Sequence, residues 1–318
     1  MNRKLICSLI LSAAAAVSYG EPVKAYDNDN VNIQIQEKQD VNSTSNKSKK
    51  GLVVEDGKTY YYNSNGTKSI GWKTINKNKY YFGEDGAAVV GWQTINNKKY
   101  YFNEDGVRAS GLQNIYNKFY YFGSNGCYST GLIDISGSQY YFGEDGAAIK
   151  GWTTVDGQKY YFGDDYKAVT GLVTINNKLY CFDEGGVQLT EWQTIYDKDY
   201  YFGEEDGAAV IGWATIEDEK YYFDKSGCSV KGLKVIDDKK YYFDSTGLIK
   251  DTWMDIDNSR YYFGEDGSAV DGWQTIEDEN YYFSENKLVL SSIKVIDGKK
   301  YYFDEKGQTV KGWKEIAN

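Results

Sequence analysis

The sequence predicts an all-β fold, an elongated β-solenoid of about thirteen tandem 20-residue β-hairpin repeats over residues 51–318. Three observations support it. A block such as Gly-Trp-Gln-Thr-Ile (91–95) recurs at a fixed period, a block such as Lys-Tyr-Tyr-Phe (99–102) follows it at a constant distance, and turn-forming residues separate the two. Because one 20-residue hairpin cannot form a core alone, stacked neighbours must cover each other's apolar faces.

The repeats keep their register along the chain. They begin at residues 51, 71, 91, 111, 131, 151, 171, 191, 212, 232, 252, 272 and 292, and a truncated fourteenth begins at 312. Every step is 20 residues except the step from 191 to 212, where Glu204-Glu205 supplies one extra residue. All eight Trp residues stand at the second repeat position, which otherwise holds Leu or Ile.

Each element of the repeat has a sequence signature. The first strand ends at a fifth position that is Ile or Val in every repeat but one, and the seventh position is Gly, Asn or Asp except at Lys77. Those residues tolerate the positive φ of tight hairpin turns. In the second strand, alternation places Tyr100 and Phe102 on one face and Tyr101 on the other. A Gly at the sixteenth position marks the turn to the next hairpin, and no helix is expected in the repeats.

The first 50 residues differ in composition from the repeats. Residues 1–25 combine a basic start, an apolar run shorter than the roughly 20 residues of a bilayer-spanning helix, and a small-residue cleavage site, which together predict a signal peptide. Residues 26–50 are polar and carry no aromatic residue after Tyr26, so a disordered linker is expected. The protein is therefore predicted to be secreted, without a transmembrane anchor, and to be extracellular or non-covalently associated with the cell wall.

Composition excludes several classes of function. The chain contains no His, which rules out Ser-His-Asp and Cys-His nucleophilic sites and His-ligated metal centres. The net charge is −10, and it becomes −12 once residues 1–25, with three basic residues and one acidic residue, are removed. Such a chain repels nucleic acid. No domain is expected that could desolvate an acid/base pair, so we predict no enzyme, no catalytic residue and no cofactor.

Neither the cysteines nor the acidic turns predict a special site. Cys127, Cys181 and Cys228 are odd in number and far apart in sequence, and each replaces a repeat residue, which favours small buried side chains over disulfides. The Glu-Asp-Gly turns, for example residues 84–86, lack the spacing of calcium-binding loops. Ordinary turn chemistry explains them, and no metal site is predicted.

The repeat resembles a known superfamily. Gly-Trp-Gln-Thr-Ile, a turn and Lys-Tyr-Tyr-Phe, followed by Asp-Gly, are similar to the cell-wall-binding repeats of Gram-positive bacteria, which include choline-binding and glucan-binding repeats. Within that superfamily they look most like the short repeats of large clostridial toxins. The resemblance covers residues 51–318 and implies a β-solenoid with carbohydrate or choline as ligand.

Two departures from the relatives bear on the ligand. Choline-binding repeats usually place a Trp just before the Tyr pair, where it completes an aromatic cage. Here that ninth position is mostly Lys and is aromatic only at Phe119. The sugar sites of the toxin domains lie in longer repeats, and none occurs here.

Two rows of aromatic residues are the ligand-binding candidates. The first row is the Trp residues of the second position: Trp72, Trp92, Trp152, Trp192, Trp213, Trp253 and Trp273. They provide flat rings for a sugar or a cation. Their replacement by Leu or Ile equally supports a core-facing position, and adjacent Trp repeats could also form shared grooves with Leu repeats as spacers.

The second row is the outward Tyr of the Tyr pair: Tyr81, Tyr101, Tyr201, Tyr222, Tyr262 and Tyr282. An outward Tyr presents a ring and a hydroxyl, which suits either a ligand contact or surface packing.

Two functions fit these features. The first is a secreted binding protein that attaches non-covalently, through many aromatic sites, to cell-wall or surface carbohydrate or to choline-bearing teichoic acid. The alternative is an extracellular adhesin or structural surface protein that recognises host or matrix glycans through the same repeats. The sequence leaves both open, because both functions need only the repeat array.

Overall fold

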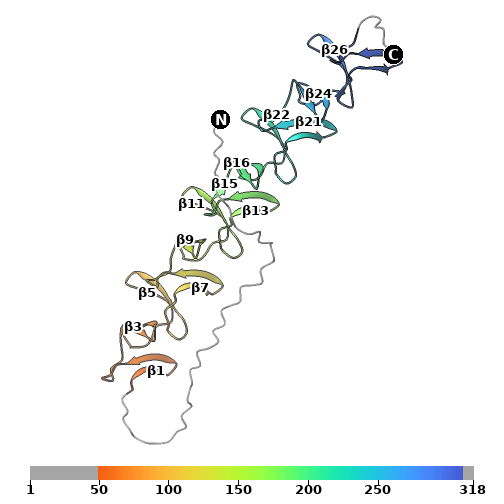
Figure 1. Cartoon of the computed structure of the whole chain (residues 1–318). Coiled ribbons are helices and arrows are strands. Elements are labelled where there is room, and N and C mark those ends of the chain that lie inside the picture. Colours follow the sequence, from red (N-terminus) through yellow and green to blue (C-terminus); the bar gives the residue numbers. More distant parts are fainter. Residues whose placement is uncertain (1–48, 311–318) are drawn as a thin grey trace, which may run out of the picture. The chain divides into compact units, whose positions relative to one another are not determined.

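The computed structural model describes residues 49–310. The predicted signal peptide, nearly all of the predicted linker and the truncated fourteenth repeat lie outside these residues. Every regular element in the described part of the chain is a strand, and no helix occurs there (Figure 1). The predicted all-β fold without helices in the repeats is confirmed.

Residues 49–310 form thirteen antiparallel hairpins. The first strands of the hairpins are β1 (Gly51–Glu55), β3 (Gly71–Ile75), β5 (Gly91–Ile95), β7 (Gly111–Ile115), β9 (Gly131–Ile135), β11 (Gly151–Val155), β13 (Gly171–Ile175), β16 (Glu191–Ile195), β18 (Gly212–Ile216), β20 (Gly232–Ile236), β23 (Thr252–Ile256), β25 (Gly272–Ile276) and β28 (Ser292–Ile296). Their partner strands are β2 (Lys58–Tyr62), β4 (Asn78–Phe82), β6 (Lys98–Phe102), β8 (Lys118–Phe122), β10 (Ser138–Phe142), β12 (Gln158–Phe162), β14 (Lys178–Phe182), β17 (Lys198–Phe202), β19 (Glu219–Phe223), β21 (Lys239–Asp244), β24 (Ser259–Phe263), β26 (Glu279–Ser284) and β29 (Lys299–Phe303). Three two-residue strands follow β14, β21 and β26: β15 (Gln188–Leu189), β22 (Gly247–Leu248) and β27 (Lys287–Leu288).

A two-residue turn closes each hairpin. In the hairpin of β5 and β6 the turn residues Asn96 and Asn97 have φ values of 53° and 61°, and Trp92 pairs with Tyr101 across the strands. Two consecutive positive φ values define the type I′ turn, whose twist matches that of antiparallel strands. Even Lys77, the residue that breaks the sequence pattern, has a φ of 69°. The predicted hairpins and their turns are confirmed.

The segment after each second strand ties successive hairpins together. The Arg108 amide donates to the Lys79 carbonyl of the preceding repeat at 2.8 Å, and the Ala109 amide donates to the Tyr101 carbonyl of its own repeat at 2.7 Å. The same pattern recurs farther along the chain, for example from the Ser229 amide to the Asp199 carbonyl at 2.7 Å. Backbone hydrogen bonds as well as side-chain packing therefore join neighbours, as the solenoid prediction requires.

Phe at the twelfth position forms the centre of the core. These side chains are at most 2% exposed: Phe82, Phe102, Phe122, Phe142, Phe162, Phe182, Phe202, Phe223, Phe243, Phe263, Phe283 and Phe303. Tyr100 packs on the same face and is buried, whereas Tyr101 is half-buried on the other face. Burying one such side chain contributes about 1.5–3 kcal/mol. The predicted alternation of the Tyr-Tyr-Phe block is confirmed.

The chain divides into two compact units. Of the described residues, one unit contains those up to Gly151 together with Phe162–Ala168, and the other contains Trp152–Tyr161 and those from Val169 onward. Within each unit the hairpins follow one another and each packs against its neighbours (Figure 1).

Two connections in the second unit have a shifted register that the sequence analysis missed. Phe243 pairs with Leu248 and Phe283 with Leu288, five positions on, whereas Phe102 pairs with Arg108, six positions on. The positive φ at the start of the next hairpin is shifted by one residue as well. Positive φ values occur at Asp251 and Ser291, the twentieth positions, instead of at a Gly in the first position.

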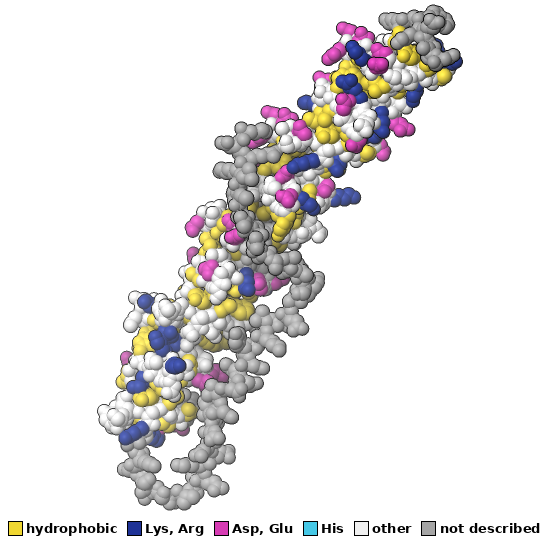
Figure 2. All heavy atoms as spheres, in the orientation of Figure 1, with side chains coloured by type: hydrophobic (Ala, Val, Ile, Leu, Met, Phe, Trp, Pro, Cys, Tyr) yellow, Lys and Arg dark blue, Asp and Glu magenta, His cyan; other side chains and the backbone are white. Residues whose placement is uncertain are grey.

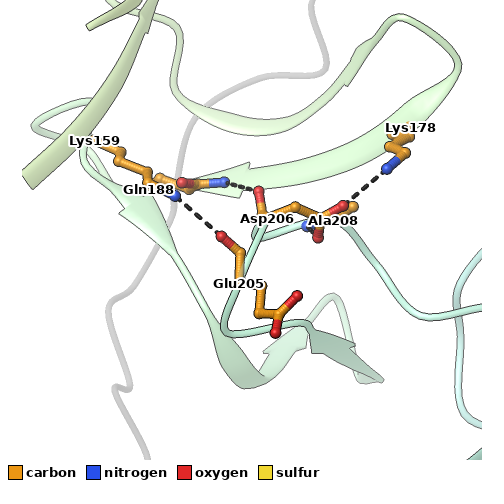
Figure 3. Close-up of polar contacts among 6 residues, drawn as sticks. All are labelled: Lys159, Lys178, Gln188, Glu205, Asp206 and Ala208. Carbon is orange, nitrogen blue, oxygen red and sulfur yellow. Dashed lines mark hydrogen bonds and ion pairs between the residues drawn. The ribbon is translucent and has the colours of Figure 1, made fainter. Parts of the chain in front are cut away.

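The one longer connection follows β17. This connection is one residue longer than the others, and its turn contacts two earlier repeats (Figure 3). The Lys159 ammonium donates to the Glu205 carbonyl at 3.2 Å, and the Gln188 amide donates to the Asp206 carbonyl at 3.0 Å. The Lys178 ammonium forms an ion pair with the Asp206 carboxylate at 2.8 Å. A single insertion is therefore accommodated without breaking the contacts between repeats.

Within the described part of the chain, Cys127, Cys181 and Cys228 are free thiols. Cys181 and Cys228 are buried in one apolar cluster, and burial raises the pKa of Cys181 to about 11. Cys127 is only half-buried, so the interpretation as a buried small side chain is confirmed for two residues and is wrong for the third.

Candidate functional site

The Trp side chains of the second position are partly exposed at the surface. Four of them are 39–42% exposed: Trp72, Trp152, Trp213 and Trp273. The others in the described chain, Trp92, Trp192 and Trp253, are half-buried. Leu112, which replaces Trp in its repeat, is 36% exposed. Trp92, Trp192 and Trp253 also pack against clusters of buried core residues, so the position faces the core and the surface at once.

Each predicted Trp contacts the predicted outward Tyr of its own repeat. The ring centroids are separated by 5.2 Å for Trp72 and Tyr81, 5.3 Å for Trp92 and Tyr101, 5.4 Å for Trp192 and Tyr201, 5.2 Å for Trp213 and Tyr222, 5.1 Å for Trp253 and Tyr262, and 5.1 Å for Trp273 and Tyr282. Trp152 makes the same contact with Tyr161, which was not among the candidates. All these pairs are edge-to-face, the geometry that aromatic quadrupoles favour.

Aromatic residues of the next repeat also contact each Trp. Trp72 also contacts Tyr100 at 5.0 Å, edge-to-face at 67°, and Phe102 at 5.9 Å. We call this set of a Trp, the Tyr of its own repeat, and the Tyr and Phe of the next repeat an aromatic cluster. The seven contributing Tyr residues of the next repeats are Tyr100, Tyr120, Tyr180, Tyr221, Tyr241, Tyr281 and Tyr301. The sequence analysis placed these Tyr residues inside the core and so missed their edges, which line the clusters.

A Trp does not need a second Trp in the next repeat to make its ring contacts. Trp152 precedes a Leu repeat, yet it contacts Tyr180 and Phe182 at 5.0 and 5.8 Å as the other Trp residues contact theirs. Among residues 49–310 no ring contact joins two Trp residues. Each cluster therefore needs only one Trp, and the shared grooves stay a prediction.

The ninth position determines the charge at each cluster. The Lys99 ammonium lies 5.0 Å from the Trp92 ring centroid, and the Arg260 guanidinium carbon lies 5.2 Å from that of Trp253. These are cation–π distances. Two clusters thus carry an internal cation on the Trp ring, where choline-binding repeats usually have an aromatic residue.

The cluster of Trp192 has a carboxylate at the ninth position instead. Asp199 accepts a hydrogen bond from the Thr194 hydroxyl at 2.6 Å and forms an ion pair with Lys231 at 2.8 Å. The seven clusters therefore share their rings but differ in the charges around them.

Three Tyr residues of the clusters have raised pKa values and remain protonated at neutral pH. Burial raises the pKa of Tyr101 and of Tyr201 above its ordinary value. The pKa of Tyr262 is raised chiefly by its hydrogen bond to Asp251, in which the hydroxyl donates at 2.8 Å. These three Tyr residues thus present neutral rings with a protonated hydroxyl.

One cluster opens into a pocket. It has a volume of about 290 Å³ and is lined by Trp72, Lys73, Thr74, Lys79, Tyr100, Arg108 and Asn125. Elsewhere, hydrophobic side chains reach the surface of both units between charged side chains of both signs (Figure 2).

The acidic turns use their carboxylates locally. Asp145 accepts the Ala147 amide on one oxygen at 2.9 Å and the Lys118 ammonium on the other at 3.2 Å. This is turn chemistry. In the described part of the chain no three Cys, Asp or Glu side chains group as metal ligands would, and no helix there has the length and apolarity needed to cross a bilayer.

Family models match most of the repeat array. The model described as choline-binding repeat matches residues 89–127, 129–166, 169–211, 210–247 and 250–287, which is more than half of the chain. The model described as putative cell wall binding repeat matches residues 70–88 and 293–308. No curated protein sequence matches the chain.

Several solved structures are similar. Choline binding protein F from Streptococcus pneumoniae is 26% identical over 82% of this chain and 98% of its own, with a TM-score of 0.49. CbpJ from Streptococcus pneumoniae TIGR4 is 23% identical over 81% and 99%, with a TM-score of 0.45. The modular autolysin LytC from Streptococcus pneumoniae, in complex with a synthetic peptidoglycan ligand, is 20% identical over 75% of this chain and 52% of its own, with a TM-score of 0.51. The last of these supports the fold.

Proposed function

Because the chain belongs to the choline-binding repeat family, we propose that it is a secreted, non-catalytic protein that attaches to the cell envelope through its aromatic clusters. The ligand is a carbohydrate or choline-bearing polymer of the wall or surface. The resemblance to Gram-positive wall-binding repeats is confirmed by the family models, whereas the finer likeness to clostridial toxin repeats stays a prediction.

The single observation that carries this proposal is the repetition of one surface cluster seven times. Trp72 and Trp273, in different repeats, have nearly the same exposure and the same ring contacts. A buried aromatic is explained by packing, but regular rows of exposed rings need another explanation. Flat rings bordered by Tyr edges suit stacking against a sugar or contact with a cation.

The geometry favours sugar over choline at two clusters. A trimethylammonium group binds by cation–π contact with a Trp ring, and Lys99 and Arg260 already make that contact with Trp92 and Trp253. A neutral sugar does not compete for charge in this way. The polymer backbone, rather than a choline substituent, is therefore the ligand that we favour.

Multiple weak sites suit attachment to a polymer. Each cluster lacks an enclosed cage, so one cluster alone binds weakly. Clusters on one chain meet a repetitive polymer at high effective concentration, which raises overall affinity by about 10²–10⁴ in favourable geometry. This strengthening requires a ligand with many copies of the recognised group.

A sedimentation assay with insoluble cell envelopes tests the proposal. The protein without residues 1–25 is expected to sediment with envelopes of the producing bacterium and to be released by soluble wall glycan or by choline, whichever is the ligand. A protein that stays in the supernatant would refute wall attachment. Binding to host-cell glycans but not to envelopes would favour the adhesin alternative.

A further inference from the structure

We propose that the pocket at Trp72 binds a negatively charged sugar, one that carries a carboxylate or a phosphate. This inference rests on the proposed function and names the ligand class of one of its sites.

The apolar part of the pocket fits a sugar ring. Trp72 is 41% exposed, and the Tyr100 ring stands edge-on to it at 5.0 Å. No cation is placed over the Trp72 ring as Lys99 is placed over Trp92. The ring face is therefore open to stacking. A volume of about 290 Å³ lies at the lower end for small-molecule pockets, which suits one sugar residue.

The polar part of the pocket is positively charged. Lys73, Lys79 and Arg108 line it, and no Asp or Glu does. Among residues 49–310 no carboxylate forms an ion pair with any of the three. The Lys73 ammonium donates to the Asn63 side-chain oxygen at 3.3 Å and lies 4.1 Å from the Tyr61 ring centroid. This leaves Lys79 and Arg108 as the cations of the pocket without such side-chain partners among the described residues. Their charge repels a quaternary ammonium group and attracts an anion.

Arg108 is positioned to recognise the anion. One terminal nitrogen of its guanidinium donates to the Asn125 carbonyl at 2.8 Å, which fixes the plane of the group. Its Nε is buried and has no hydrogen-bond partner in the described part of the chain. The guanidinium is thereby held in one orientation, and its terminal N–H groups are suited to a carboxylate or phosphate oxygen of a ligand.

A second pocket contains residues at the same repeat positions but has a different charge. The positive charge of the first pocket is therefore not common to all repeats. It includes Thr215 and Lys220, which occupy the repeat positions of Thr74 and Lys79. Its lining also contains Asp218, Glu219, Glu265 and Asp266. Leu248 lies there because of the shifted connection, in the place that Arg108 takes in the first pocket. The same repeat position thus gives a basic pocket in one unit and an acidic pocket in the other.

Nuclear magnetic resonance of the Trp indole N–H groups tests the proposal at the pocket itself. The protein that begins at residue 26 is labelled with ¹⁵N-Trp. The Trp72 signal is assigned as the one that disappears in the Trp72→Leu variant. Glucuronate or glucose 6-phosphate is expected to shift this signal at concentrations about tenfold or more below those needed for glucose. The acid that shifts the signal at the lower concentration shows whether the pocket prefers a carboxylate or a phosphate. Choline is expected to leave the signal unchanged.

Two variants separate charge recognition from ring stacking. Arg108→Gln is expected to weaken the response to the preferred acid by about tenfold to a hundredfold, the effect of losing a hydrogen bond to a charged group, and to leave the glucose response unchanged. Lys220→Gln in the acidic pocket is the matched control and is expected to have no effect. Unchanged spectra of the other Trp residues establish that each variant is folded.

Three results would overturn the inference: equal responses to glucose and the acids, an unchanged response in Arg108→Gln, or a stronger response to choline. Envelope sedimentation of the same proteins separates a failure of this inference from a failure of the proposed function. If the envelopes still bind the protein while the Trp72 signal shows no preference for acids, the inference falls and the proposed function stands.

Discussion

The residue at the ninth repeat position determines which ligand a Trp can meet. Lys99 and Arg260 lie over the Trp of their own repeat, whereas Asp199 brings a carboxylate to the same position beside Trp192. One substitution at a fixed position therefore changes a cluster from one that repels cations to one that tolerates them. Identical aromatic frameworks can thus differ in ligand.

We predict that Lys99→Ala uncovers the Trp92 ring. The affinity of that ring for tetramethylammonium is expected to rise by about twofold to thirtyfold, since a cation–π contact is worth about 0.5–2 kcal/mol. The measurement is the titration of the Trp92 indole N–H signal. Lys98→Ala is the control, because Lys98 is exposed and lies on the opposite face of the strand. Equal effects of both variants would mean that net charge, not ring access, controls binding.

At the level of the element, the hairpin turn is the most constrained part of the repeat. Both turn residues have positive φ in every hairpin, which costs little for Gly or Asn and more for other residues. Lys77 adopts this conformation at 69° without the side-chain chemistry that favours it. Strand pairing and stacking therefore impose the turn on the sequence at this position.

Lys77→Gly is expected to stabilise the first unit by about 0.5–1 kcal/mol. Relief of the left-handed conformation gains about 1–2 kcal/mol, and the greater freedom of Gly in the unfolded chain offsets part of that gain. Asn97→Gly should gain less, because Asn already tolerates its φ of 61°. Urea unfolding followed by circular dichroism measures both. A loss of stability in Lys77→Gly would contradict the account of the turn.

The second turn predicts a pH dependence. The Ala147 amide and the Lys118 ammonium lower the pKa of Asp145 below its ordinary value. A carboxyl whose pKa is depressed in the folded state contributes stability above its unfolded pKa of about 4, and that contribution is lost as pH falls through the folded pKa.

Asp145→Asn keeps an amide oxygen for the turn, as Asn125 does naturally when it accepts the Cys127 amide at 2.9 Å. The free energy of unfolding of the wild type is expected to exceed that of the variant by about 0.2–1 kcal/mol at pH 5, which is the range of an exposed ion pair. This difference should vanish near pH 2. Denaturant unfolding at the two pH values is the measurement. A difference that persists at pH 2 would show that the charge of Asp145 is irrelevant.

The periodic features were predictable from sequence, and the local deviations were not. The fixed period, the turn residues and the Tyr-Tyr-Phe alternation gave the hairpins and their core face. The shifted connections left a weaker signal: Leu248 and Leu288 at the seventeenth position, and no Gly at the start of the following hairpin. Such a signal becomes readable only when strand pairing is known.

The cluster was only half predictable, because it is made by two repeats. Trp72 and Tyr81 face each other across one hairpin, which alternation predicts. Tyr100 belongs to the next repeat, and its contact depends on the stacking of hairpins, which sequence periodicity does not describe. The position of Lys99 over Trp92 likewise depends on a side-chain conformation.

At the level of the whole molecule, the repeat array predicts an elongated solution shape. A compact domain of this length has a radius of gyration of about 18 Å. Small-angle X-ray scattering of residues 51–318 is expected to give a value well above that, with a maximum dimension characteristic of a rod. A radius of gyration near 18 Å would contradict the predicted elongated solenoid.

The central claim is that the aromatic clusters bind the envelope polymer together, and stepwise replacement of Trp by Leu tests it most directly. Leu occurs naturally at the second position, for example at Leu112 and Leu132, so the fold should tolerate the exchange. Envelope affinity is measured for full-length proteins with one, two, four and all seven of the described Trp residues replaced, with circular dichroism as the folding control. We predict a graded fall with each step, because linked sites strengthen one another. Wild-type affinity in the folded sevenfold variant would contradict the claim, and complete loss after a single replacement would reveal one dominant site instead of an array.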